Sequence, residues 1–313
     1  MFYTEDLANI LSLINDKDLD LIELLKIQRI VKRKLNNINV ATKIQSIEEF
    51  SKIPLKFHNK CDIDYDVKQS DLIKYINVHT ISFCDEKVSK IHMFKNIHTL
   101  NCSETDVTDV SMLGNLHTLN CSYTRVSDVS ALGKLHTLDC SSTFVTDVSM
   151  LGNLHILKCA NTNVSDVSAL GKLHTLDCHG TLVNDVNMLD KLHTLECSCT
   201  NITDVSNLGN LHTLSFLDTK VKDVSTLTNV HTLICAHTLV TNVSMLTNLR
   251  VLECNDTEVS DVHPLVNLVT LYCQHTKIKD VNGLINLRKL ICDDTLDKEF
   301  FENNSNIHYM IAM

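Results

Sequence analysis

Residues 116–134 read Leu-His-Thr-Leu-Asn-Cys-Ser-Tyr-Thr-Arg-Val-Ser-Asp-Val-Ser-Ala-Leu-Gly-Lys, and residues 135–153 repeat them with few changes. Cysteines recur in the same phase, nineteen residues apart, at 102, 121, 140, 159, 178 and 197, and again at 235, 254, 273 and 292. Phe216 fills the gap in this series, and Phe83 extends it backward. A short unit repeated in this way predicts a solenoid, in which each unit forms one coil.

We number the repeat from position 1, Leu116, to position 19, Lys134, and call each unit a coil. Apolar residues recur at positions 1, 4, 6, 11, 14 and 17. Positions 4 and 6 alternate with mostly polar positions 3 and 5, which predicts a strand with one buried face. Nineteen residues leave no room for a helix on the return leg, so we predict extended or 3-10 backbone there. A single coil cannot bury these positions alone, so the core forms between neighbouring coils.

The spacing Leu-x-x-Leu-x-Cys-x-x-Thr-x-Val resembles the leucine-rich repeat, Leu-x-x-Leu-x-Leu-x-x-Asn-x-Leu, with Cys at the third Leu and Thr at the Asn. The segment Asp128-Val129-Ser130-Ala131-Leu132 resembles the Asp-Ile-x-Pro-Leu part of internalin-like repeats, as does His263-Pro264-Leu265. This resemblance covers residue 78 to about 295. It implies an α/β-type solenoid, an arc with a parallel β-sheet on its concave face.

The repeats divide the chain into four predicted parts. Residues 1–59 form a helical amino-terminal region, and residues 60–77 form a cap or degenerate repeat. Residues 78–295 form the nineteen-residue repeats, and residues 296–313 form a carboxy-terminal cap. Caps are expected because an open solenoid end would expose core residues.

The amino-terminal region carries apolar residues at helical spacing, followed by Asp18-Leu19 and a second apolar segment that ends in Lys32-Arg33-Lys34. This arrangement resembles an F-box, although the Pro and the final aromatic residue of that motif are missing. The resemblance implies binding to a Skp1-like protein through Leu7, Ile10, Leu11, Ile14 and Leu19. An F-box followed by leucine-rich repeats resembles the substrate adaptors of ubiquitin ligases. The composition and the His-Thr-Leu coils are also similar to repeat proteins of amoeba-infecting giant viruses.

The formal net charge is −10, and residues 1–77 contribute 12 basic and 12 acidic side chains, so the repeats carry the excess acid. Nucleic-acid binding depends on Lys and Arg that neutralise phosphates, so we predict no nucleic-acid partner. The first residues are acidic, unlike the basic start of a secretory signal, and no apolar run is long enough to span a membrane. With thirteen cysteines, an odd number, we predict reduced thiols in an intracellular protein that is not bound to membranes.

Nine histidines occupy position 2, four residues before the core Cys or Phe: His79, His98, His117, His136, His155, His174, His193, His212 and His231. His-x-x-x-Cys suggests zinc, and a metal-binding repeat protein is one alternative function. Zinc ligands must converge on one centre, however, whereas this row spreads along the array. We therefore predict a ladder of imidazoles that stack or bond to adjacent backbone. Because protonated neighbouring rings repel each other, we expect the array to loosen near pH 5.

Aspartates recur at position 13, as at Asp109, Asp128 and Asp147, and could suggest calcium. Calcium sites need several oxygens around one ion, so capping of the return-leg turn is the simpler prediction. The His, Asp, Ser and Cys residues repeat in phase rather than forming one constellation, and no Gly-rich phosphate loop is present. We predict neither an enzyme nor a cofactor.

The variable positions 3, 5, 7 and 8 are predicted to face the concave sheet and to select a protein partner. An apolar patch with acidic surroundings is typical of a protein-binding surface. The predicted partner-binding residues are Lys158, Glu196, Ser215, Leu217, Asp218, Ile234, His237, Glu253, Tyr272, His275 and Ile291. The sequence thus favours an intracellular scaffold that binds a protein partner, whose identity the sequence does not give, on its concave surface. An internalin-like cell-surface adhesin is the other alternative.

Overall fold

The computed structural model describes residues 43–44, 60–63, 79–83, 88–293 and 308–311. The chain divides into two compact units, residues 1–42 and residues 43–313, and the described residues all belong to the second. The predicted amino-terminal helices and the F-box-like residues Leu7 to Leu19 therefore lie outside the described part of the chain.

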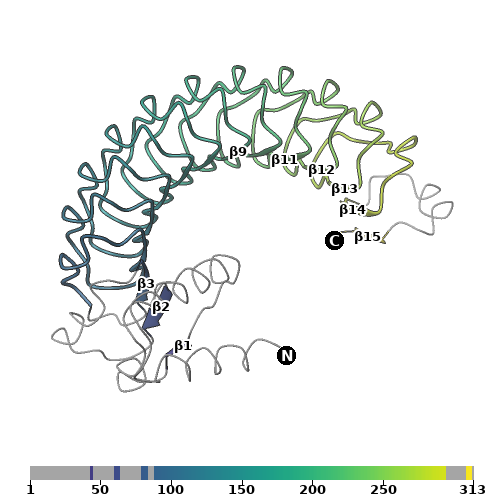
Figure 1. The fold of residues 1–313 in the computed structure, drawn as a ribbon. Coiled ribbons are helices and arrows are strands. Elements are labelled where there is room, and N and C mark those ends of the chain that lie inside the picture. Colours follow the sequence, from purple (N-terminus) through teal and green to yellow (C-terminus); the bar gives the residue numbers. More distant parts are fainter. Residues whose placement is uncertain (1–42, 45–59, 64–78, 84–87, 294–307, 312–313) are drawn as a thin grey trace, which may run out of the picture. The chain divides into compact units, whose positions relative to one another are not determined.

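The second unit is built on one parallel sheet whose strands follow each other in sequence order (Figure 1). Each strand of the array comes from one coil and lies on the inner side of its curve (Figure 1). The strands are β1 (Lys43–Ile44), β2 (Lys60–Ile63), β3 (Thr80–Phe83), β4 (Thr99–Asn101), β5 (Thr118–Asn120), β6 (Thr137–Asp139), β7 (Ile156–Lys158), β8 (Thr175–Asp177), β9 (Thr194–Glu196), β10 (Thr213–Ser215), β11 (Thr232–Ile234), β12 (Val251–Glu253), β13 (Thr270–Tyr272), β14 (Lys289–Cys292) and β15 (His308–Ile311). This solenoid confirms the predicted parallel-sheet repeat architecture.

The strands are short because only positions 3 to 5 have strand geometry, yet backbone hydrogen bonds continue beyond both ends. Before β5, the His117 and Thr118 N–H groups both donate to the His98 carbonyl, at 2.8 and 3.1 Å. After β5, the Cys121 N–H donates to the Asp139 carbonyl of the next coil at 2.8 Å. These bonds lock each coil to its neighbours in the register predicted by the nineteen-residue period.

The core runs the length of the array and consists of the predicted positions. In the coil of Leu116, the residues at positions 1, 4, 6, 11, 14 and 17 are at most 1% exposed. Phe216 fills the cysteine position and is fully buried, as expected for an apolar slot. A fully buried Leu contributes roughly 1.5–3 kcal/mol, so the stability of the array lies in the contacts between coils.

The return leg consists of extended segments and turns rather than helix. The Leu132 N–H donates to the Val129 carbonyl at 3.0 Å, and the Leu135 N–H donates to the Leu132 carbonyl at 2.9 Å. These two successive turns redirect the chain toward the next strand. The described residues contain no helix long and apolar enough to cross a lipid bilayer.

Three strands belong to regions that the sequence assigned to the ends. Strand β1 lies in the predicted region 1–59 and pairs with β2, which lies in the predicted cap 60–77. Strand β15 lies in the predicted cap 296–313 and pairs with β14. The compact unit begins at residue 43, earlier than the predicted start of the repeats.

Candidate functional site

The solvent-facing side of the sheet carries one side chain per coil at position 5. The strand register places Ser215 beside Ile234, Ile234 beside Glu253, Glu253 beside Tyr272, and Tyr272 beside Ile291. We call these five residues the concave row. The structure thus brings together, on consecutive strands, five of the residues that the sequence predicted for partner binding.

Position 5 has a local structural role in the earlier coils. The side-chain oxygen of Asn120 accepts a hydrogen bond from the Ser122 N–H at 3.0 Å, which caps the turn after the strand. The same bond occurs at Asn101, Asp139, Asp177 and Glu196. Lys158, Ile234, Tyr272 and Ile291 have no oxygen acceptor at that place on the side chain. These four side chains therefore do not cap the turn after the strand, so this structural role does not account for them.

The concave row combines apolar and charged groups in a small area. Ile234, Glu253, Tyr272 and Ile291 are half-buried, whereas Ser215 is buried and its hydroxyl lies 3.4 Å from that of Ser198. The Lys289 ammonium donates to the Tyr272 hydroxyl at 2.7 Å, which orients the ring. Rigid aromatic and aliphatic side chains of this kind are typical anchors in protein interfaces.

Position 8, which the sequence grouped with positions 3, 5 and 7, follows the strand and has left-handed backbone, with φ near +55° in nearly all coils. Its N–H groups still bond to the next coil, as from His237 to the Asn255 carbonyl at 3.0 Å. Asp218, His237 and His275 therefore lie at the ends of their strands. Leu217, at position 7, is half-buried, and Lys158 on β7 is exposed.

The strand-end residues of the last coils form a row in which imidazole rings alternate with carboxylates. The Asp256 carboxylate lies 3.7 Å from Nδ1 of His237 and 3.0 Å from Nδ1 of His275. Nε2 of His275 lies 3.9 Å from the Asp293 carboxylate. All four groups are at least partly exposed, so these pairs orient side chains more than they stabilise the fold.

The position-2 histidines form the predicted ladder of stacked imidazoles. Successive rings from His79 to His231 lie 3.9–5.4 Å apart with interplanar angles of 5–17°. In the middle coils Nδ1 bonds to the position-19 carbonyl, at 2.9 Å for His155 and Asn153. A carbonyl only accepts, so Nδ1 carries the proton and Nε2 is left with the lone pair.

The ladder geometry is unfavourable for metal binding. Nearly parallel rings direct their Nε2 lone pairs in parallel, whereas a metal ion needs ligands that converge. Within the described residues, no three His, Cys, Asp or Glu side chains are grouped so that they could hold a metal ion.

The position-13 aspartates cap the return-leg turn, as predicted. Oδ1 of Asp128 accepts from the Ser130 N–H at 2.8 Å, and this bond, together with the Ser130 hydroxyl, lowers the pKa of the carboxyl. His263 adds a variation, because its ring lies 2.8 Å from Asp261 and 3.2 Å from Asp280. Hydrogen bonds to these two carboxylates raise the pKa of His263.

The repeated cysteines are free thiols in the core. Burial raises the pKa of the Cys140 and Cys235 thiols to about 12. Among the cysteines of residues 88–293, Cys199 is the exposed one. Position 9 threonine is buried beside them, and the Thr143 hydroxyl donates to the Cys140 carbonyl at 2.6 Å. Thr thus supplies the turn bond expected from a residue in the place of Asn.

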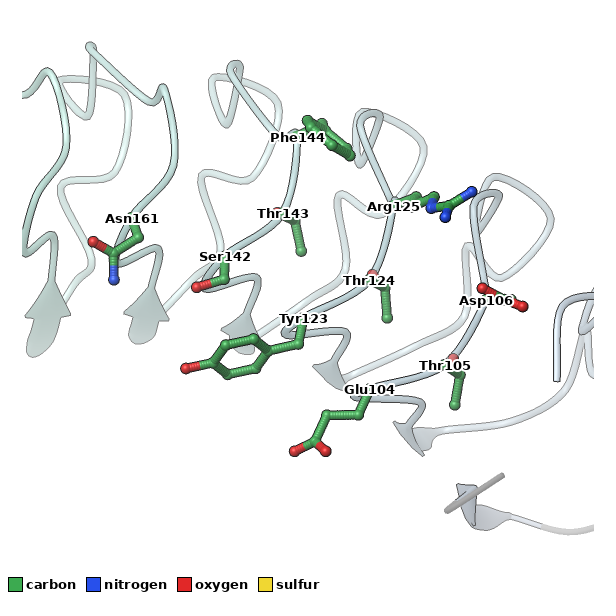
Figure 2. Close-up of a pocket in the computed structure, with 10 residues that line it drawn as sticks. All are labelled: Glu104, Thr105, Asp106, Tyr123, Thr124, Arg125, Ser142, Thr143, Phe144 and Asn161. Atoms are coloured by element: carbon green, nitrogen blue, oxygen red, sulfur yellow. The ribbon is translucent and has the colours of Figure 1, made fainter. Parts of the chain in front are cut away.

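Sequence reasoning missed a groove at the strand ends of the early coils (Figure 2). It is open, encloses about 690 Å³, and includes Tyr123, Arg125 and Phe144. Position 10, which supplies Arg125 and Phe144, was not among the positions predicted to vary for binding. The signal in the sequence was one aromatic residue in each of two successive coils, Tyr123 at position 8 and Phe144 at position 10.

No protein-family model and no curated protein matches the sequence. Similar solved structures include an internalin (inlF) from Listeria monocytogenes, with 20% identity, a TM-score of 0.73 and coverage of 90% of this chain and 93% of that one. The functional domain of InlJ from Listeria monocytogenes, which includes a cysteine ladder, has 20% identity and a TM-score of 0.58, over 76% of this chain and 69% of that one.

A third similar structure is the ectodomain of the Arabidopsis thaliana receptor kinase GASSHO1/SCHENGEN3, in complex with CASPARIAN STRIP INTEGRITY FACTOR 2. It has 14% identity and a TM-score of 0.55, over 83% of this chain and 39% of that one. None of these three is described as an F-box protein or comes from a giant virus. The nineteen-residue coils, the parallel sheet and these likenesses together show that the chain has the leucine-rich-repeat fold, with internalins among its structural neighbours.

Proposed function

We propose that the chain is a scaffold that binds a protein partner on the concave row. The observation that carries this proposal is the in-register placement of Ile234, Glu253, Tyr272 and Ile291 on the solvent-facing side of a rigid sheet. Leucine-rich-repeat solenoids typically act as binding scaffolds rather than enzymes, and one structural neighbour is described in complex with CASPARIAN STRIP INTEGRITY FACTOR 2.

The partner chemistry follows from the row and its rim. The two Ile side chains and the Tyr272 ring supply apolar contact. Glu253 lies between Ile234 and Tyr272 in the row. Asp218 and Asp256 add carboxylates at the strand ends. A complementary surface has an apolar centre and basic residues around it. Burial of such aromatic anchors accounts for most of the binding free energy in many interfaces.

The experiment compares two substitutions in one coil by quantitative affinity capture from the cells that express the protein. Ile234→Lys places a charge on the concave row, and Met245→Lys places the same charge on the exposed return leg of that coil. We expect Ile234→Lys to remove the specific partner and Met245→Lys to retain it. Equal recovery by both variants, with unchanged urea midpoints, would exclude the concave row.

The proposal extends to a role as an F-box-type substrate adaptor inside the cell. Its support is the amino-terminal sequence, with the apolar residues Leu7, Ile10, Leu11, Ile14 and Leu19. The test is capture with the full chain carrying Leu11→Asp, with Asn9→Asp as the control outside the apolar face. Recovery of a Skp1-like protein with Asn9→Asp and its loss with Leu11→Asp is expected. Absence of such a protein from both eluates contradicts the adaptor role.

The competing function is an internalin-like adhesin at the cell surface. Internalins are structural neighbours at 20% identity, which shows a common fold. Cell fractionation separates the two functions, because an adhesin accumulates in the medium or on the surface. We expect the protein in the intracellular fraction, with its core thiols reduced.

A further inference from the structure

The groove at the strand ends of the early coils has two walls. Position 8 supplies one wall, with Glu104, Tyr123, Ser142 and Asn161, and position 10 supplies the other, with Asp106, Arg125 and Phe144. Figure 2 shows the two rows running along the array, with the position-9 threonines between them. The groove therefore crosses successive coils and suits an extended chain rather than a compact small molecule.

Tyr123 is costly for the fold. Its φ of 56° lies in the left-handed region, which a residue with a bulky side chain rarely adopts. The ring is 65% exposed, so burial offsets little of this cost. The same backbone recurs at position 8 of the other coils, where it is held by tolerant residues such as Asn161 and Gly180 but also by Ser142 and Cys199. The repeat therefore imposes this conformation, and the tyrosine is not needed to form it.

Phe144 strengthens the case, because it lies in the next coil and is also 65% exposed. Met150, on the return leg of the same coil, shows that exposed apolar residues occur elsewhere, but here two aromatic rings from successive coils line one groove. Successive strands are ~4.8 Å apart, so the two rings can contact different side chains of one bound segment.

The charges of the groove define which segment fits. Glu104 and Asp106 are exposed on opposite walls of the coil that precedes Tyr123. Two carboxylates beside an aromatic ring attract a Lys or Arg side chain through ion pairing and cation–π attraction. Arg125 disfavours a second basic residue beside Tyr123, and Phe144 favours an apolar one.

We propose that this groove binds an extended peptide segment with one Lys or Arg followed, about three residues later, by an apolar side chain. Three coils span ~10 Å between their first and last strands, and three residues of extended chain cover a similar distance at ~3.4 Å each. The basic side chain lies between Glu104 and Asp106 against Tyr123, and the apolar side chain packs on Phe144. This site is separate from the concave row and does not depend on it.

The test titrates the full chain with two fluorescein-labelled decapeptides of Gly and Ser. One peptide carries Arg and Leu three residues apart, and the other carries Glu in place of Arg. We expect saturable anisotropy changes for the Arg peptide, with at least tenfold weaker binding of the Glu peptide. No saturable binding of the Arg peptide up to about 1 mM, or equal binding of both peptides, would overturn the proposal.

Variants locate the binding within the groove. Tyr123→Asn keeps a side chain that tolerates left-handed backbone and should weaken binding about tenfold, whereas Tyr123→Phe should retain it. Glu104→Gln combined with Asp106→Asn should abolish the preference for Arg over Glu. Met150→Ala removes an equally exposed side chain from the coil of Phe144 and should change nothing. Unchanged binding by Tyr123→Asn, or an equal loss by Met150→Ala, contradicts the assignment. The groove lies in coils that precede the concave row. Peptide binding by these variants and partner capture by the Ile234→Lys variant therefore test the two proposals separately.

Discussion

At the scale of single residues, the repeated Cys shows how position decides chemistry. Cys197 and Cys199 are two residues apart, yet one is fully buried and the other exposed. Burial raises the pKa of the Cys197 thiol well above its ordinary value, which leaves almost no reactive thiolate at neutral pH. The cysteine series therefore acts as a row of small apolar side chains.

This contrast gives a direct prediction for thiol labelling. Brief treatment of the native protein with iodoacetamide should modify Cys199 first among the cysteines of residues 88–293, and peptide mass spectrometry identifies the site. Unfolding in urea should make Cys140 and Cys197 react at comparable rates. Modification of Cys140 as fast as Cys199 in the native state would contradict the buried core.

At the scale of the element, the coil imposes left-handed backbone at position 8 whatever residue stands there. Glycine is the residue suited to this conformation, and it occurs there as Gly180, with φ of +64°. A Cβ added at that residue would also lie 2.8 Å from Oδ1 of Asn161, although that side chain can move.

Gly180→Ala should therefore lower the free energy of unfolding by about 1–2 kcal/mol. Gly209→Ala is the matched control, because a Cβ there meets nothing within 4 Å and the backbone is not left-handed. That control should be neutral or slightly stabilising, by about 0.4–1 kcal/mol. Urea unfolding measures both variants. Equal effects of the two substitutions would contradict the backbone assignment.

The imidazole ladder is a second element, and it couples stability to pH. Desolvation by burial, followed by neighbouring imidazoles, lowers the pKa of His98 and His117. In the unfolded chain these groups have a pKa of about 6.5. As pH falls through that value the unfolded state binds protons first, so the contribution of His98 and His117 to stability is lost between pH 7.5 and 5. Lys134, Lys172 and Lys191 at position 19 add positive charge beside it.

The measurement is the urea midpoint at pH 7.5 and at pH 5, which we expect to fall. His98→Gln combined with His117→Gln should reduce this fall. His263→Gln should increase it, because the raised pKa of His263 contributes stability at pH values below about 6.5. The position-13 carboxyls have lowered pKa values and lose their contribution only at more acidic pH. An unchanged midpoint would contradict the lowered pKa of His98 and His117.

The same element shows what the sequence could predict. The nineteen-residue period and the pattern of apolar residues were sufficient to predict which positions are buried, as at Leu119, Cys121 and Val126, because burial repeats from coil to coil. The backbone at position 8 could not be predicted, because Tyr123 and Cys199 disfavour the conformation that the stacked coils impose on them. The Tyr123–Phe144 groove depends on that turn geometry, and it was missed for the same reason.

At the scale of the whole molecule, one set of repeat positions builds the solenoid, and we expect another set to select the partner. Buried positions repeat almost without change, and they build a sheet whose solvent-facing side differs from coil to coil. Up to Glu196, most position-5 side chains cap their own turns, whereas Ile234, Tyr272 and Ile291 do not. The concave row is therefore where we expect the partner to bind.

Photo-cross-linking tests this central claim most directly. Tyr272 is replaced by p-benzoylphenylalanine in one preparation of the full chain and Met245 in another, and both are irradiated in extract of the cells that express the protein. We predict that the residue at 272 cross-links one specific protein and that the residue at 245, on the exposed return leg, does not. Cross-linking of the same protein only from position 245, or from neither position, would contradict partner binding on the concave row.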